Sequence, residues 1–114
     1  MSKLCIQIQP SRAPNLDLNN LRSLCQQLAS TEKLVDRFQT NEGFDQISYL
    51  NILFDTATLF DLWQAIQTQL YENTEIGADL GRASIATCEG DKGWDDYLLL
   101  YHFDPTIQLD ELAA

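Results

Sequence analysis

Ile47-Ser48-Tyr49-Leu50-Asn51-Ile52-Leu53-Phe54, with the helix-like segment that follows it to Tyr71, sets the fold class of this chain. Successive residues of a strand point to opposite sides, and here both sides are largely apolar, which predicts an interior strand. Beyond Asp55-Thr56-Ala57, apolar residues recur at helical spacing: Leu59, Leu62, Trp63, Ile66 and Leu70. Thr58 and Asp61 have the spacing of a capping box at the start of this helix. A buried strand that leads directly into an amphipathic helix is the nucleus of a layer of strands and helices.

The segment before this nucleus predicts one more strand and one more helix. Apolar and polar residues alternate strictly from Lys3 to Gln9, which is typical of a strand with one buried face. Pro10 and Pro14 end the strand because a proline has no N–H to donate. Asn15 or Asp17 can cap the following helix. Its expected buried stripe is Leu18, Leu21, Leu24, Cys25 and Leu28.

Two hairpins complete the predicted fold. Residues 34–40 are compatible with a short strand, and Asn41-Glu42-Gly43 predicts a turn before the chain re-enters the sheet at Phe44. Residues 76–81 contain two glycines and are expected to form a loop. Residues 82–89 and 94–103 then form a second hairpin around Gly90-Asp91-Lys92-Gly93.

The order β-α-β-β-α-β-β predicts an α+β fold, a two-layer sandwich of the ferredoxin-like kind. Two helices are expected on one face of an antiparallel sheet, and the strand order beyond the hairpins stays open. The chain has 114 residues, enough for one core. We expect a single α+β domain over residues 1–105 and a short acidic C-terminal tail over residues 106–114.

The charge balance is the unusual global feature. Seventeen acids against seven bases give a net charge of −10, and residues 71–114 alone hold ten of the acids and two of the bases. Such a chain is a poor match for nucleic-acid phosphates or an anionic membrane surface, and a good match for a basic protein. The competing interpretation is that the acids only keep a small protein in solution.

The three cysteines, Cys5, Cys25 and Cys88, are widely spaced and form no zinc or redox motif. We expect reduced thiols in a cytoplasmic protein, because no secretory signal is visible either. Neither a metal nor a cofactor is predicted. Glu89, Asp91 and Asp95 bracket the glycine turn, but they lack the alternating ligand spacing of a calcium loop.

Catalysis is not indicated by any motif. His102 is the single histidine, and Asp104 lies two residues on, where it could orient the ring as a catalytic base. A strand histidine with a purely structural role is the preferred interpretation. Cys88 near Lys92 could be a mildly activated thiol, although no second cysteine or histidine supports it.

A cluster of aromatic and acidic residues near the second hairpin carries the functional hypothesis. Aromatic anchors within a charged rim are typical of protein interfaces. The predicted partner-binding residues are Glu89, Asp91, Trp94, Asp95, Asp96 and Asp104. The competing interpretation places Tyr97, Leu99 and Tyr101 on the core face of the last strand.

The sequence therefore favours a small acidic binding protein, an inhibitor or immunity-type factor that neutralises a basic partner such as a nuclease toxin. The alternative is a ferredoxin-like enzyme or ligand-binding domain with a pocket near His102. A nucleic-acid mimic is a third interpretation, for which a net charge of −10 is small. A homodimer through the open face of the sheet is compatible with the same pattern.

Overall fold

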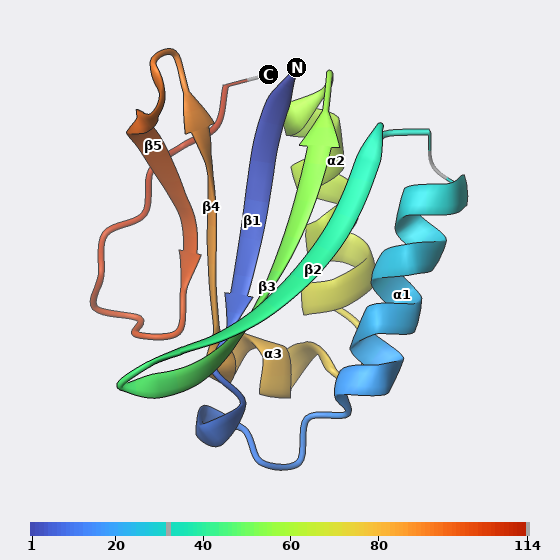
Figure 1. Cartoon of the computed structure of the whole chain (residues 1–114), viewed down its shortest axis with the longest axis vertical. Coiled ribbons are helices and arrows are strands. Elements are labelled where there is room, and N and C mark those ends of the chain that lie inside the picture. Colours follow the sequence, from blue (N-terminus) through green and yellow to red (C-terminus); the bar gives the residue numbers. More distant parts are fainter. Residues whose placement is uncertain (32, 114) are drawn as a thin grey trace.

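The chain folds around one five-stranded sheet in which every strand runs antiparallel to its neighbours, in the order β2-β3-β1-β4-β5. The computed structural model describes residues 1–31 and 33–113 (Figure 1). The elements are β1 (Ser2–Ile8), η1 (Pro10–Arg12), α1 (Leu18–Thr31), β2 (Arg37–Asp45), β3 (Ile47–Thr56), α2 (Leu59–Ile66), η2 (Gln67–Tyr71), α3 (Gly77–Ala83), β4 (Ser84–Gly90) and β5 (Gly93–His102). In Figure 1, α2 lies behind β3 and β2, α1 lies at the right-hand side next to β2, and α3 lies at the lower end of the sheet.

One face of the sheet supplies most of the core. Leu4 and Ile6 of β1 are fully buried, and Ile6 pairs with the fully buried Ile52 of β3. The residues that alternate with them, such as Cys5 and Leu53, are only partly buried. β3 is thus an interior strand, as its sequence predicts, while helices cover only one of its two apolar faces.

Short polar side chains accept backbone N–H groups at the start of α1 and just before α2. The Asp17 carboxylate accepts the Asn20 amide at 3.0 Å, which confirms Asp17 as the cap of α1. The capping box predicted at Thr58 is wrong, because the Thr58 side chain caps nothing. The Thr56 hydroxyl accepts the Thr58 amide at 3.0 Å instead. The packing of α2 follows the predicted stripe, with Leu62, Trp63 and Ile66 buried.

The loop predicted over residues 76–81 is wrong, since Gly77–Ala83 forms the helix α3. Ile76, Leu80 and Ala83 are buried, and this burial outweighs the low helix propensity of Gly77 and Gly81. Gly77 is required by close packing, because a Cβ there would lie 2.2 Å from the Tyr71 carbonyl oxygen.

The first hairpin turns later than its sequence predicts. β2 continues through Asn41, Glu42 and Gly43, and the chain reverses at Gln46, whose φ is +64°. Gly43 lies opposite Tyr49, and a Cβ on Gly43 would overlap the Tyr49 ring. The glycine therefore makes room for a cross-strand ring within the strand rather than a turn.

The α+β class and the antiparallel sheet are confirmed. Three helices and the five-strand order β2-β3-β1-β4-β5 differ from the plain two-helix ferredoxin-like sandwich that the sequence predicts. None of the helices in the described ranges is long and apolar enough to span a membrane.

Residues 104–113 have no regular secondary structure but are attached to the sheet and the core. The Asp110 amide donates to the Leu99 carbonyl at 2.8 Å, and the Leu99 amide donates to the Asp110 carboxylate at 2.8 Å. Leu112 packs against the edge of the core. This segment therefore occupies part of the outer side of β5.

Candidate functional site

The β4–β5 hairpin contains an irregularity that brings four consecutive side chains to the surface. Gly90 pairs with Gly93 and Cys88 pairs with Leu98, so β5 advances five residues while β4 advances two. The four residues Trp94, Asp95, Asp96 and Tyr97 therefore lie opposite the single residue Glu89, and all four are exposed. A regular strand would have turned every second one of them toward the core.

Two glycines make this bulge possible. Gly93 has a φ of +72°, which lies in the left-handed region that glycine adopts without strain. Gly90 lies so close to the bulged strand that a Cβ there would be 1.9 Å from the Asp96 carbonyl oxygen. Larger residues at either position would force the hairpin into another geometry.

The bulge exposes two large aromatic side chains among acids. Trp94 is 41% exposed and Tyr97 is 56% exposed. Asp91, in the turn, is also exposed, as are Asp95 and Asp96 of the bulge. The surface formed by residues 89, 91 and 94–97 is called the hairpin surface below.

Glu89 and Asp104, the remaining predicted partner-binding residues, differ in position. Glu89 belongs to the hairpin surface, but it is partly buried and one carboxylate oxygen accepts the Lys3 amide at 2.7 Å. Asp104 follows the far end of β5, so most of that strand separates it from the turn. The structure thus brings five of the six predicted residues together and leaves Asp104 apart.

The competing interpretation, which places Tyr97 on the core face of the last strand, is wrong for this residue, because Tyr97 is exposed. The alternation of Tyr97, Leu99 and Tyr101 would give a shared core face, but the register of β5 against β4 shifts twice, once between Gly93 and Leu98 and once between Leu99 and Tyr101. Tyr101 alone packs inward, with its ring 4.6 Å from that of Tyr71. The adjacent acids Asp95 and Asp96 were the available signal, since a regular strand would point one of them inward.

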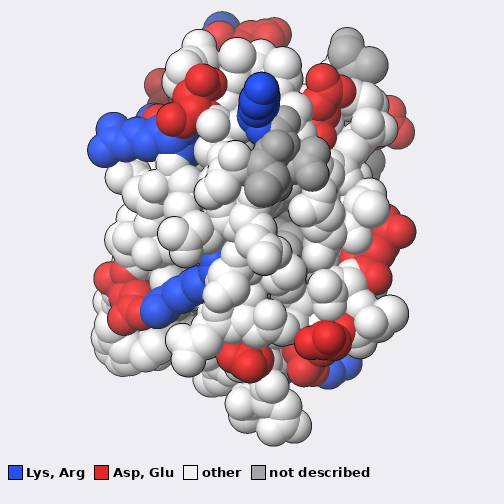
Figure 2. All heavy atoms as spheres, turned by 90° about the vertical axis from the view of Figure 1, so that its right-hand side faces the viewer, with Lys and Arg blue, Asp and Glu red and all other residues white. Residues whose placement is uncertain are grey.

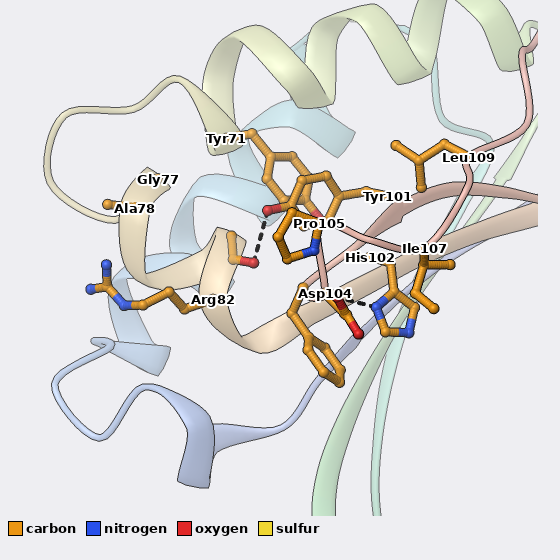
Figure 3. A pocket seen from close by; sticks show the side chains of 12 residues that line it. Tyr71, Gly77, Ala78, Arg82, Tyr101, His102, Asp104, Pro105, Ile107 and Leu109 are labelled. Carbon is orange, nitrogen blue, oxygen red and sulfur yellow. Dashed lines mark hydrogen bonds between the residues drawn. The ribbon is translucent and has the colours of Figure 1, made fainter.

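A pocket of about 610 Å³ lies at the other end of β5 (Figure 3). Ala78 and Arg82 of α3 lie on one side of it, and His102 and Ile107 lie on the other (Figure 3). Its lining residues are Tyr71, Gly77, Ala78, Gly81, Arg82, Tyr101, His102, Phe103, Asp104, Pro105, Ile107 and Leu109.

The two tyrosines of this pocket already have hydrogen-bond partners. The Tyr101 hydroxyl donates to the Gly81 carbonyl at 2.8 Å, and the Tyr71 hydroxyl lies 2.8 Å from the Ser84 hydroxyl. Burial raises the pKa of Tyr71 well above its usual value, so this phenol stays protonated. The tyrosines therefore give the pocket shape and apolar surface rather than a base.

His102 is not oriented by the Asp104 carboxylate, as a catalytic base would require, but contacts the Asp104 backbone. The Asp104 amide donates to His102 Nδ1 at 3.0 Å, which leaves Nε2 to carry the proton of a neutral ring. The Asp104 carboxylate accepts the Thr106 amide at 2.9 Å and the Thr106 hydroxyl at 2.7 Å. These two hydrogen bonds lower the pKa of Asp104. The carboxylate thus binds Thr106, and Asp104 contacts the His102 ring through its backbone amide instead.

The cysteines are free thiols without activation. Burial raises the pKa of Cys5 to about 11, that of Cys25 to about 12 and that of Cys88 to about 11. The hypothesis that Cys88 is an activated thiol near Lys92 is wrong, because activation would lower the pKa of Cys88 and the pKa is raised instead. Within residues 1–31 and 33–113, His, Cys, Asp and Glu side chains form no group of three that could hold a metal ion.

No protein-family model matches this sequence, and neither curated proteins nor solved structures give a match to it. A proposal for its function therefore rests on the geometry of this chain.

Proposed function

We propose that this protein binds a basic protein through its hairpin surface and acts as an inhibitor or immunity-type factor, for instance against a nuclease toxin. The observation that carries this proposal is the bulge, which exposes Trp94 and Tyr97 between Asp91, Asp95 and Asp96. Each ring offers a large area that a partner can desolvate, and each carboxylate attracts a cationic surface.

The exposed apolar area of these rings is available to contribute binding free energy. A tryptophan that contributed to the core would be buried, as Trp63 is at 8% exposure, whereas Trp94 keeps 41% of its surface in water. Burying this remaining apolar area in a partner pocket is favourable at about 25 cal/mol per Å². The neighbouring acids add little to that affinity, but they speed the encounter with a basic partner.

Two further features of the protein belong to the same proposal. We place it in the cytoplasm, a location supported by its three free cysteines, which an oxidising compartment would tend to pair. We also propose that the sheet is an extended ferredoxin-like sheet. The run β4-β1-β3-β2, with α1 between β1 and β2 and α2 between β3 and β4, supports this, and β5 is then an added edge strand.

The test compares two exposed aromatic residues on different hairpins. Partners recovered from the native lysate by the wild-type protein are identified and purified, and binding of the variants is then measured directly. We expect Trp94→Ala to raise the dissociation rate and to weaken binding by about 2–4 kcal/mol. Phe44→Ala is the matched control, because Phe44 is 75% exposed on the other hairpin and should leave binding unchanged.

The acids are tested by rate rather than by affinity. Asp91→Asn with Asp95→Asn should slow association and flatten its dependence on salt, because exposed charges act mainly on the encounter. Equal binding by the wild type, Trp94→Ala and the double Asn variant would place the interface elsewhere and overturn the proposal.

The pocket near His102 supports a second candidate, a domain that binds a small apolar ligand. The observation in its favour is the volume of about 610 Å³, bounded by aromatic and aliphatic side chains, with His102 at its rim. Because His102 Nδ1 already accepts the Asp104 amide, Nε2 is the ring atom that would donate to a ligand. Titration with small uncharged aromatic carbonyl compounds, followed by NMR, would shift the His102 and Ile107 resonances if this site binds such ligands. Shifts scattered over the whole surface, or none at all, would dismiss this candidate.

A further inference from the structure

β2 is an edge strand with one free side. It pairs with β3 from Arg37–Asp55 to Asp45–Ile47 without a register shift. No backbone hydrogen bond joins its outer side to another part of the described chain. The other edge, β5, is bulged and is held at Leu99 by Asp110. Natural sheets usually protect their edge strands by bulges or by a covering segment, as at β5. The β2 edge has no such protection in the described chain, so it is available for pairing with another strand.

The sequence of β2 is complementary to itself in the antiparallel direction. When two copies pair with Asn41 opposite Asn41, Arg37 of each copy lies opposite Asp45 of the other, and Phe38 lies opposite Phe44. Directly opposed residues of an antiparallel pair share a face of the sheet. The present register agrees with this, since Phe38 and Phe44 lie on one face of β2 and Arg37 and Asp45 on the other.

The neighbouring registers lose these pairs. A slip by one residue is excluded, because it would send each side chain to the wrong face. Centring the pair on Thr40 places Phe38 opposite Glu42 and Arg37 opposite Gly43. Centring it on Glu42 places two glutamates opposite each other, which is destabilising. The Asn41-centred register alone combines two opposite-charge pairs with two aromatic pairs.

The exposure of the side chains fits the same arrangement. Phe38 already packs against Phe54, with 5.5 Å between the ring centroids, and Phe44 is 75% exposed. A second copy would place its Phe44 beside Phe38 and extend this row of rings. Figure 2 faces the side of the molecule that carries α1 and β2, and acidic and basic groups are interspersed there rather than gathered by sign. Such a mixed surface permits two copies of an acidic chain to approach.

We infer that this protein forms a symmetric homodimer through antiparallel β2–β2 pairing centred on Asn41, with a continuous ten-stranded sheet. The contact leaves both hairpin surfaces and the open face of the sheet free. Its small size predicts a reversible dimer with a dissociation constant on the order of micromolar.

The test uses charge reversal in the full-length protein, followed by sedimentation equilibrium over a range of concentrations. Arg37→Asp places aspartates opposite Asp45, and Asp45→Arg places arginines opposite Arg37. Each single variant should dimerise about tenfold more weakly than the wild type, because two attractive pairs become repulsive. An equimolar mixture of the two variants should recover dimerisation, since opposite charges then face each other at both ends of the mixed pair.

Two controls separate this dimer from a folding defect and from a dimer through another surface. Circular dichroism and thermal unfolding check that the single variants fold, and Phe44→Asp, at the exposed end of β2, gives an independent weakening without touching Arg37. Trp94→Ala should dimerise like the wild type, because it lies on the other hairpin. A wild-type chain that stays monomeric at all accessible concentrations would overturn the inference. So would single variants that dimerise as well as the wild type, a result that would point to the open face of the sheet.

Discussion

Tyr71 links the helical side of the core to the sheet through both its ring and its hydroxyl. Its ring lies 5.8 Å from that of Trp63 and 4.6 Å from that of Tyr101, between centroids. Its hydroxyl is hydrogen-bonded to Ser84, whose side chain is fully buried at the start of β4. A buried hydroxyl pair is costly to break on one side only, because the remaining partner loses both water and its hydrogen bond.

This pair gives a prediction about stability. Tyr71→Phe keeps the ring and removes the hydroxyl, and should lower the free energy of unfolding by about 1–3 kcal/mol. Ser84→Ala should do the same from the other side. The double variant should cost less than the two single costs together, by about 0.5 kcal/mol or more, because it leaves no unpaired group. Urea denaturation of the four proteins measures this coupling, and strictly additive costs would show that the hydroxyls do not interact.

At the level of strands and helices, the periodicity of apolar residues correctly predicted the elements that bury one apolar face. β1, β3, α1 and α2 follow their patterns, because alternation or helical spacing and burial agree in each. α3 was missed because its buried residues are too few to outweigh the two glycines in the sequence. The turn was placed at Gly43 rather than Gln46, because a glycine that accommodates a ring looks the same as a glycine that turns the chain.

The candidate site was predictable in its location but not in its geometry. The acids and Trp94 pointed to the second hairpin, and the structure gathers five of the six predicted residues there. The bulge depends on how far β5 advances against β4, a long-range property that local residue preferences do not encode. For that reason the sequence left Tyr97 open between the core face and an exposed interface, and it is found at the surface. The pocket wall formed by residues 103–109 likewise depends on the return of the C-terminal segment across the end of β5.

In the molecule as a whole, the two edges of the sheet have different chemistry. The β2 edge carries Arg37, Glu42 and Asp45, a mixture of signs, and its register is regular. The β5 edge carries the acidic hairpin surface, is bulged, and is partly covered by residues 104–113. Self-association at one edge and partner binding at the other would not compete, because β3, β1 and β4 lie between them.

The core makes the stability of the protein sensitive to alkaline pH. Burial raises the pKa of Cys25 from 9.0 to about 12, and it raises the pKa values of Cys5, Cys88 and Tyr71 as well. Below pH 9 these groups are protonated in both states and their contribution is fully present. Above it, the unfolded chain releases protons that the folded chain retains, so unfolding becomes more favourable as the pH rises.

Each such group lowers the free energy of unfolding by up to about 1.4 kcal/mol per pH unit between its unfolded and folded pKa values. Urea midpoints should therefore be level from pH 7 to about 8.5 and fall steadily from pH 9 to 11. Cys25→Ala removes one ionisable group from the core, so its midpoint should start lower, because a cavity is left, and fall less steeply. Among the three thiols, burial raises the pKa of Cys25 furthest, which makes its variant the most sensitive one. Parallel pH profiles for the wild type and Cys25→Ala would mean that the Cys25 thiol ionises equally easily in both states, contrary to its burial.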